Sequence, residues 1–261
     1  MTDGFPRALD QPVALVNFIE NYLHRLEAQI GAHPNSRRKG GNLYDFDREW
    51  SNELSGERSA LPAFVAIAQL EASRQHLRAV SALLPLDDVD QPVLACSRAC
   101  VEASARALFV LDPEVTPSER FARALNESWE VASSQKATGK EARAGLTNLA
   151  ARLGIDFQMK QRSARFGALP RPSMSASLRR GLATIGYPED TFEKFLPFLN
   201  GAAHAGMDAG LLTFAIQGDA TQVGQVARCT AALAALAAFG QAQTASAKYQ
   251  GYPPIGESGL T

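Results

Sequence analysis

The chain has 261 residues, of which 46% are hydrophobic and 20% are charged. This length and apolar content suit one large domain, or two small ones, with a buried core, and they exclude a disordered or fibrous protein. Lysine and arginine total 26 against 27 aspartate and glutamate, so the net charge of -1 gives no overall attraction to nucleic acid or to an anionic membrane.

Three cysteines and the start of the chain indicate a cytoplasmic protein. Cys96, Cys100 and Cys229 are odd in number and lie among alanines and valines, so we expect small core residues in a reducing compartment. The first ten residues lack the basic stretch and apolar run of a secretory signal. The most apolar segment, 226–239, is interrupted by an arginine and a threonine, which favours a core helix over a membrane span.

Helical periodicity and capping residues account for most of the chain. The alternating Val, Ile and Thr runs that predict strands are missing. We therefore expect an all-α fold, an up-and-down helical bundle of about seven to eight helices. In chain order, helices are predicted at 12–30, 59–84 and 92–111, then from about 117 and from about 139, and again at 175–185, 191–214 and 219–248.

Two capping boxes predict helix starts in the middle of the chain. Thr116 precedes Glu119 by three residues, and Thr138 precedes Glu141 in the same way. In such a pair the hydroxyl of the first residue and the carboxylate of the second satisfy free backbone N–H groups. Pro117 takes the first helical position after Thr116, where its missing N–H costs nothing.

The predicted domain is a single helical unit over residues 1–250, with candidate halves 1–160 and 170–250 and a frayed tail at 251–261. Glycines and prolines predict loops at 33–42 and at 161–175.

Both predicted loops are basic. The first holds Arg37, Arg38 and Lys39, and the second belongs to a region rich in arginine that extends to Arg180. For the first loop a solvated loop is the simpler interpretation and an anion site is the alternative, and the second is expected to connect two helical halves. Nucleic-acid binding through these stretches is a further candidate function, which predicts binding that falls steeply with salt.

The helix predicted at 191–214 has bulky apolar residues on one face and small residues on the opposite face, so neighbours would cover both. Between these faces lie Asn200, His204 and Asp208, spaced i, i+4, i+8, whose side chains would stack along one line and could reach one ligand. The simpler interpretation is a buried structural histidine held by its neighbours. The alternative is a metal ligand or a catalytic acid or base.

A second polar stripe, Arg98, Glu102 and Arg106, lies on the third predicted helix among apolar residues. One interpretation is a solvent-facing row of ion pairs. The other is an internal network in which the arginines hold an anionic group or pair with His204 and Asp208, because charges in an apolar setting need partners.

The next predicted helix carries further polar residues at similar spacing, which we expect on the surface rather than in a site. They are Arg120, Arg123, Asn126 and Glu127. The chain lacks a phosphate-binding glycine-rich loop before a lysine, a cysteine pair with metal spacing, a helical histidine pair around a glutamate, and a serine elbow. The sequence therefore assigns neither a metal nor a cofactor.

Three stretches resemble a group of uncharacterised actinobacterial all-helical proteins, which are in turn similar to the HEPN-like and AbiV-type families. They are HLRAVSALL from His76, PVLACSRACVEASARALFVLDPEVTPSERFARALNE from Pro92, and FLPFLNGAAHAG from Phe195, and together with their surroundings they cover about half of the chain. The resemblance implies a helical bundle and dimerisation.

In the nuclease members of that superfamily, an arginine lies four to six residues before a histidine on one helix, and the pair cuts RNA without metal. His204 matches the histidine, but Phe198, Leu199 and Asn200 occupy the window of the arginine. The resemblance therefore does not extend to RNA cleavage by that pair.

The stripe around His204 also resembles the second metal-binding motif of class I terpene synthases. In that motif Asn, Ser or Thr, and Glu at these intervals hold magnesium, whereas here a histidine replaces the hydroxyl residue. Magnesium prefers oxygen ligands, so the imidazole argues against it. The acidic companion motif would have to come from 87–90, which we expect in a turn.

The leading hypothesis is a HEPN-like helical binding or regulatory module in defence or stress, with a small-molecule or protein partner or as a homodimer. The alternative is an enzyme that acts on a small apolar metabolite in a pocket of the bundle, by acid-base or metal-dependent chemistry like that of a terpene cyclase. The candidate catalytic residues are His204, Asn200 and Asp208, and the candidate binding residues are Arg98, Glu102 and Arg106.

Overall fold

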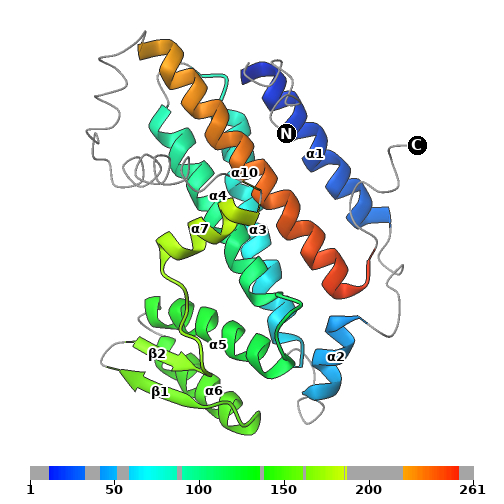
Figure 1. Cartoon of the computed structure of the whole chain (residues 1–261), viewed down its shortest axis with the longest axis vertical. Coiled ribbons are helices and arrows are strands. Elements are labelled where there is room, and N and C mark those ends of the chain that lie inside the picture. The colour runs from blue at the N-terminus through cyan, green and yellow to red at the C-terminus, as the bar shows by residue number, and fades with distance from the viewer. Residues whose placement is uncertain are drawn as a thin grey trace. The chain divides into compact units, whose positions relative to one another are not determined.

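The computed structural model of the chain describes residues 12–32, 42–51, 59–86, 90–135, 138–160, 163–184, 186 and 220–252. These residues form eight helices and one two-stranded sheet, so the prediction of an all-α helical fold is confirmed (Figure 1). The helices are α1 (Pro12–Ala32), α2 (Leu43–Trp50), α3 (Leu61–Leu83), α4 (Asp90–Val110), α5 (Pro117–Ser134), α6 (Gly139–Arg152), α7 (Met174–Thr184) and α10 (Ala220–Gln250), and the strands are β1 (Phe157–Lys160) and β2 (Ser163–Phe166). The predicted helix at 191–214 and the tail beyond 252 lie outside the described residues.

The chain divides into two compact units, each drawn from three separated stretches. Unit 1 comprises Met1–Pro34, Leu70–Ala105 and Met174–Gln243, and unit 2 comprises Asn35–Gln69, Arg106–Ser173 and Thr244–Thr261. The chain passes from one unit to the other within α3, α4 and α10. The single domain with candidate halves expected from the sequence stays a prediction.

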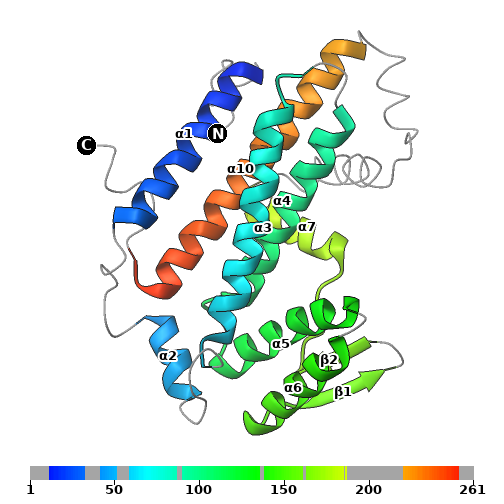
Figure 2. The same ribbon diagram turned by 180° about the vertical axis from the view of Figure 1, so that it is seen from behind.

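In unit 1, α1, α4 and α10 run in one direction and α3 runs in the opposite direction (Figures 1 and 2). The ring of Tyr22 from α1 meets that of Phe239 from α10 edge-on at 6.1 Å. Ser73 on α3 donates its hydroxyl to the backbone carbonyl of Cys100 on α4 at 3.0 Å, and the Cys100 thiol lies 3.5 Å from the carbonyl of Ala235 on α10. These contacts join the four helices.

The cysteines are free, and the prediction that they are core residues is confirmed for Cys100 and Cys229, which are buried. Cys96 is half-buried. Burial raises the pKa of the Cys100 thiol to about 12, so this thiol stays protonated and unreactive near neutral pH.

In unit 2, α5 packs on α6 and on the β1–β2 hairpin. Their shared core contains Phe121, Leu125, Trp129 and Phe166. The side chain of Asn126 on α5 pairs with the backbone of Phe166 as a neighbouring strand would: its Nδ2 donates to the carbonyl at 3.0 Å, and its Oδ1 accepts from the N–H at 3.0 Å. This pairing satisfies the buried end of β2.

The hairpin corrects the loop predicted at 161–175, because residues 163–166 form β2. The strands pair antiparallel, with Phe157 opposite Phe166. Gly167 follows in the left-handed region with φ of 69°, and a Cβ there would lie 2.8 Å from that of Ala122. Four-residue strands are too short for an alternating pattern to be recognised, so the sequence shows only the glycine and prolines.

Two helix starts test the capping predictions. The Thr116 hydroxyl accepts from the backbone N–H of Glu119 at 3.3 Å, which confirms the cap of α5. The second cap is wrong: Thr138 has helical backbone angles and no capping hydrogen bond, and its hydroxyl donates to Gln135 at 2.9 Å. Helix α6 nevertheless begins one residue after Thr138. Within the described ranges, no helix has the length and apolar character needed to cross a membrane.

Candidate functional site

The three candidate catalytic residues, Asn200, His204 and Asp208, lie outside the described residues. The roles expected for them stay predictions. The same holds for the basic residues at 37–39 and for Arg162. The three candidate binding residues, in contrast, all lie on α4 and are described.

Four polar residues of α5 that we expected on the surface are buried, and that prediction is wrong. The exposed fraction is 1% for Arg120, 4% for Arg123, 2% for Asn126 and 2% for Glu127. All four lie in unit 2 and find partners within it. They were missed because a helix is expected to bury one face, and the sequence does not show which other elements supply the matching groups.

Arg120 is held by a buried carboxylate from α2. Its Nε lies 3.0 Å and its Nη2 2.7 Å from Oδ1 of Asp47, so one edge of the guanidinium group binds the carboxylate. The hydroxyl of Tyr249 on α10 donates to Oδ2 of Asp47 at 2.6 Å. The remaining nitrogen, Nη1, donates to the backbone carbonyl of Val115. This buried cation therefore has a complete set of partners.

Tyr249 acts only as a donor in this network. Burial raises the pKa of its hydroxyl, and the negative charge of Asp47 raises it further. The phenol therefore stays protonated and keeps its hydrogen bond to the carboxylate.

Arg123 and Arg106 are also paired. The Nη1 of Arg123 donates to the carbonyl of Phe109 at 2.7 Å and to Asp112 at 3.1 Å. The Nη1 of Arg106 lies 3.2 Å from Oε2 of Glu127, whose other oxygen accepts from Nε of Arg171 at 3.0 Å. Arg106 thus belongs to an ion-pair network inside unit 2.

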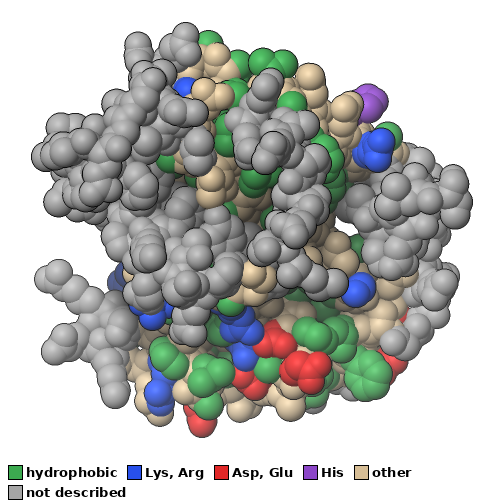
Figure 3. Space-filling view, turned by 45° about the horizontal axis from the view of Figure 1, so that its top comes forward, with side chains coloured by type: hydrophobic (Ala, Val, Ile, Leu, Met, Phe, Trp, Pro, Cys, Tyr) green, Lys and Arg blue, Asp and Glu red, His purple; other side chains and the backbone are tan. Residues whose placement is uncertain are grey.

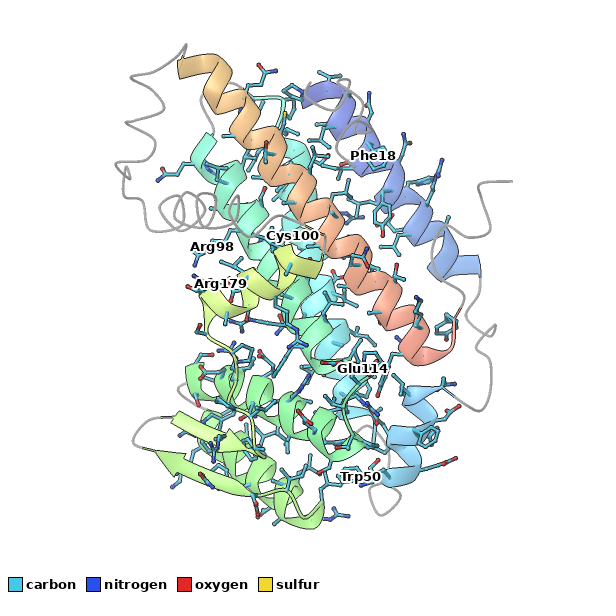
Figure 4. All side chains as sticks on the ribbon, in the orientation of Figure 1. Phe18, Trp50, Arg98, Cys100, Glu114 and Arg179 are labelled. Carbon is cyan, nitrogen blue, oxygen red and sulfur yellow. The ribbon has the colours of Figure 1, made fainter. Side chains whose placement is uncertain are left out.

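Arg98, two helical turns earlier on α4, is a buried cation of unit 1 with different surroundings (Figure 4). Its exposed fraction is 6%, so the interpretation of a solvent-facing row is wrong for this residue. Its Nη2 contacts the thioether sulfur of Met174 on α7. Its buried Nε has no hydrogen-bond partner, and no carboxylate of the described chain forms an ion pair with it.

Helix α7 places a second polar atom at this interface. A Cβ on Gly181 would lie 3.0 Å from the side chain of Val101 and 3.1 Å from that of Ala105, so this face of α7 lies directly against α4. Met174 and Ser177 are on the same face, seven and four residues earlier. Ser177 is 2% exposed, and its hydroxyl has no hydrogen-bond partner in the described chain.

The third candidate, Glu102, is half-buried on α4. Its charge acts on His76 of α3, whose pKa is lowered by burial more than Glu102 raises it. His76 is therefore mainly neutral at pH 7. The structure thus places Glu102 near a titratable group of α3, which the sequence stripe did not indicate.

Among the described side chains, no group of three or more His, Cys, Asp or Glu could hold a metal ion. Comparison of the chain with protein-family models, curated proteins and solved structures finds no match. The resemblance to HEPN-like and AbiV-type proteins stays a prediction. On the face shown in Figure 3, the acidic side chains lie in the lower part of the view among basic and apolar ones, and a few further basic side chains lie higher up.

Proposed function

We propose that this protein is a helical binding module that takes an anionic ligand at Arg98. The observation that carries the proposal is the burial of a guanidinium group whose contacts are a thioether on one nitrogen and none on Nε within the described chain. This deepens the hypothesis, drawn from the sequence, that the arginines of α4 hold an anionic group.

Burying a charged group costs free energy. A cation taken out of water is destabilising by several kcal/mol unless a counter-charge and hydrogen bonds compensate for it. Arg120 and Arg123 receive such compensation from Asp47 and Asp112. The sulfur that Arg98 contacts is only a weak acceptor without charge. An anion that reached Arg98 would therefore gain a strong, charge-assisted interaction.

The wider parts of the proposal are supported by the sequence alone. The family resemblance supports a HEPN-like regulatory role in defence or stress and a homodimer, and the odd number of cysteines supports a cytoplasmic setting. The alternative function, an enzyme that acts on a small apolar metabolite, depends on His204 and its neighbours on the undescribed stretch and stays a prediction.

Thermal unfolding of the Arg98→Met variant tests the proposal. Methionine keeps the apolar volume and removes the buried charge, so in chloride buffer the variant should unfold at a higher temperature than the wild type, by about 2 to 4 °C for each kcal/mol gained. Sodium phosphate at constant ionic strength should stabilise the wild type, by about 2.7 kcal/mol at a hundred times its Kd. It should not stabilise the variant.

Arg25→Met is the matched control, because Arg25 is an exposed arginine of α1 in the same unit. It should keep the response to phosphate. Equal stabilisation of the wild type and of Arg98→Met by phosphate would contradict the proposal. So would a strong loss of stability in Arg98→Met, since that result assigns the arginine a structural role.

A further inference from the structure

We infer that the ligand is a small molecule with a terminal phosphate group, bound by the Nε–Nη2 edge of Arg98 and by the hydroxyl of Ser177, and that Met174 covers this edge until the ligand displaces it. The inference rests on the proposed function and specifies its ligand class. Three observations support it: the donors on the Nε–Nη2 edge of Arg98, the buried Ser177 hydroxyl on α7, and the weakly accepting thioether of Met174.

The Nε–Nη2 edge of a guanidinium group is its usual binding edge for an oxyanion. Nε and Nη2 present two parallel N–H donors, which match two oxygens of a carboxylate or phosphate. In Arg120 this same edge binds Asp47. In Arg98 it is faced by the Met174 sulfur at Nη2, while Nε lacks a hydrogen-bond partner in the described chain. The two donors of this edge are therefore suited to one oxyanion.

A hydroxyl group on α7 complements this edge. The Arg120 site combines the guanidinium edge with a hydroxyl donor, that of Tyr249, on the same carboxylate. The candidate for the corresponding hydroxyl is Ser177, which is buried and lies on the face of α7 that packs on α4, between Met174, which contacts Arg98, and Gly181. Its Oγ has no hydrogen-bond partner in the described chain. A ligand that accepts from both groups would satisfy two buried polar atoms at once.

The side chain of Met174 covers the edge of Arg98. Met174 begins α7 and is 45% exposed, so its side chain reaches from solvent to the buried guanidinium group. Methionine is flexible and its thioether is a weak acceptor, so little interaction energy is lost when an anion takes its place. Met174 therefore marks the point where a ligand enters, and it also limits access to the edge.

The number of hydrogen-bond donors indicates the class of ligand. The edge of Arg98 and the Ser177 hydroxyl provide three donors, and a phosphate group presents at least three oxygens to them, whereas a carboxylate has two. Arg98 is only 6% exposed, which suits a small terminal group better than an extended chain.

Calorimetric titration of the full chain with inorganic phosphate, phenyl phosphate and acetate tests the inference. In the wild type, both phosphates should bind more tightly than acetate. Ser177→Ala should weaken phosphate binding about tenfold and acetate binding less, because one hydrogen bond to an anion is lost. Met174→Ala should tighten the binding of all three, because the cover is removed.

The matched controls are Ser175→Ala and Met159→Ala. Ser175 is an exposed serine of α7, and Met159 is an exposed methionine of β1. Neither variant should change any Kd. Phenyl phosphate should bind at least as tightly as inorganic phosphate, because the ester group can remain in solvent.

Two other outcomes separate this inference from the proposed function. If Arg98→Met abolishes binding while Ser177→Ala and Met174→Ala leave every Kd unchanged, the three-donor site is wrong and the anion-binding function stands. If acetate binds as tightly as phosphate, the ligand class is wrong. If the wild type binds none of the three anions, the proposed function and this inference fail together.

Discussion

Arg98 and Arg120 are both buried arginines, and they differ in what faces the Nε–Nη2 edge. A carboxylate and a phenol complete the surroundings of Arg120, whereas a thioether meets Arg98. The first arrangement holds elements of unit 2 together, and the second leaves a charge that a ligand can use. This contrast predicts that removing the counter-charge of Arg120 destabilises the protein, whereas removing the charge of Arg98 stabilises it.

Asp47→Asn should be strongly destabilising. The substitution keeps the shape of the side chain but leaves the Arg120 cation buried without its counter-charge, which costs about 3–5 kcal/mol. Tyr249→Phe removes one hydrogen bond and should cost about 1–2 kcal/mol. Urea unfolding followed by circular dichroism measures both losses. A loss for Asp47→Asn no larger than that for Tyr249→Phe would show that the charge is compensated in another way.

His76 should make stability depend on pH. Its pKa in the folded protein is lowered from 6.5, by burial and against the opposing effect of Glu102. Its contribution to stability is therefore fully present above pH 6.5 and is lost as the pH falls through the lowered pKa. His76→Gln should remove this part of the dependence in urea unfolding between about pH 7 and 5. Equal slopes in the wild type and in His76→Gln would contradict the assignment.

At the scale of elements, the contact of α7 with α4 positions both Met174 and Ser177. Gly181 makes this close approach feasible, because an added Cβ would lie 3.0 Å from the Val101 side chain and 3.2 Å from its backbone carbonyl. The backbone oxygen cannot move aside as a flexible side chain would. The position of α7 therefore depends on a residue without a side chain.

Gly181→Ala should lower stability by about 1–3 kcal/mol through overpacking, and it should weaken phosphate binding by shifting the helix that carries Ser177. Gly145→Ala on α6 is the matched control, since nothing lies within 4 Å of the added Cβ. That variant should be stabilised by roughly 0.5–1 kcal/mol, because alanine favours a helix interior. Urea unfolding and phosphate titration measure the two effects. Unchanged phosphate binding in Gly181→Ala would show that α7 does not position the site.

The elements differ in how far the sequence could predict them. Long periodic helices such as α3 and α4 were located within a few residues, because twenty or more residues of apolar periodicity outweigh local ambiguity. The sequence does not predict the hairpin, because its strands are held by packing on α5 and no local pattern shows that contact. Thr138 shows the same limit for capping, since its hydroxyl has Gln135 as a competing partner.

The candidate site was partly predictable for a related reason. A stripe of charges on an apolar helix identified Arg98 and Arg106 as groups that need partners. The sequence could not show that Arg106 would find Glu127 and that Arg98 would meet Met174, because those partners come from other helices. No sequence pattern identifies Ser177 as a site residue, because serines are common in short helices and only the structure shows that this one is buried.

At the scale of the whole molecule, the 26 basic and 27 acidic residues nearly balance, so the net charge does not attract an anion. Any attraction must come from local groups. The face in Figure 3 agrees with this, because its described charges of both signs are mixed with apolar side chains. We therefore expect an anion to be held by one guanidinium group rather than by a broad basic surface. Nucleic-acid binding through the basic stretches stays a separate prediction.

Nitrogen-15 NMR of the arginine Nε–H groups during a phosphate titration tests this dependence most directly. The Arg98 signal is identified by its loss in Arg98→Met. It should shift along a saturable binding curve, while the Arg120 signal, fixed by Asp47, should stay in place. A phosphate titration that saturates the protein and leaves the Arg98 signal unmoved would contradict the account.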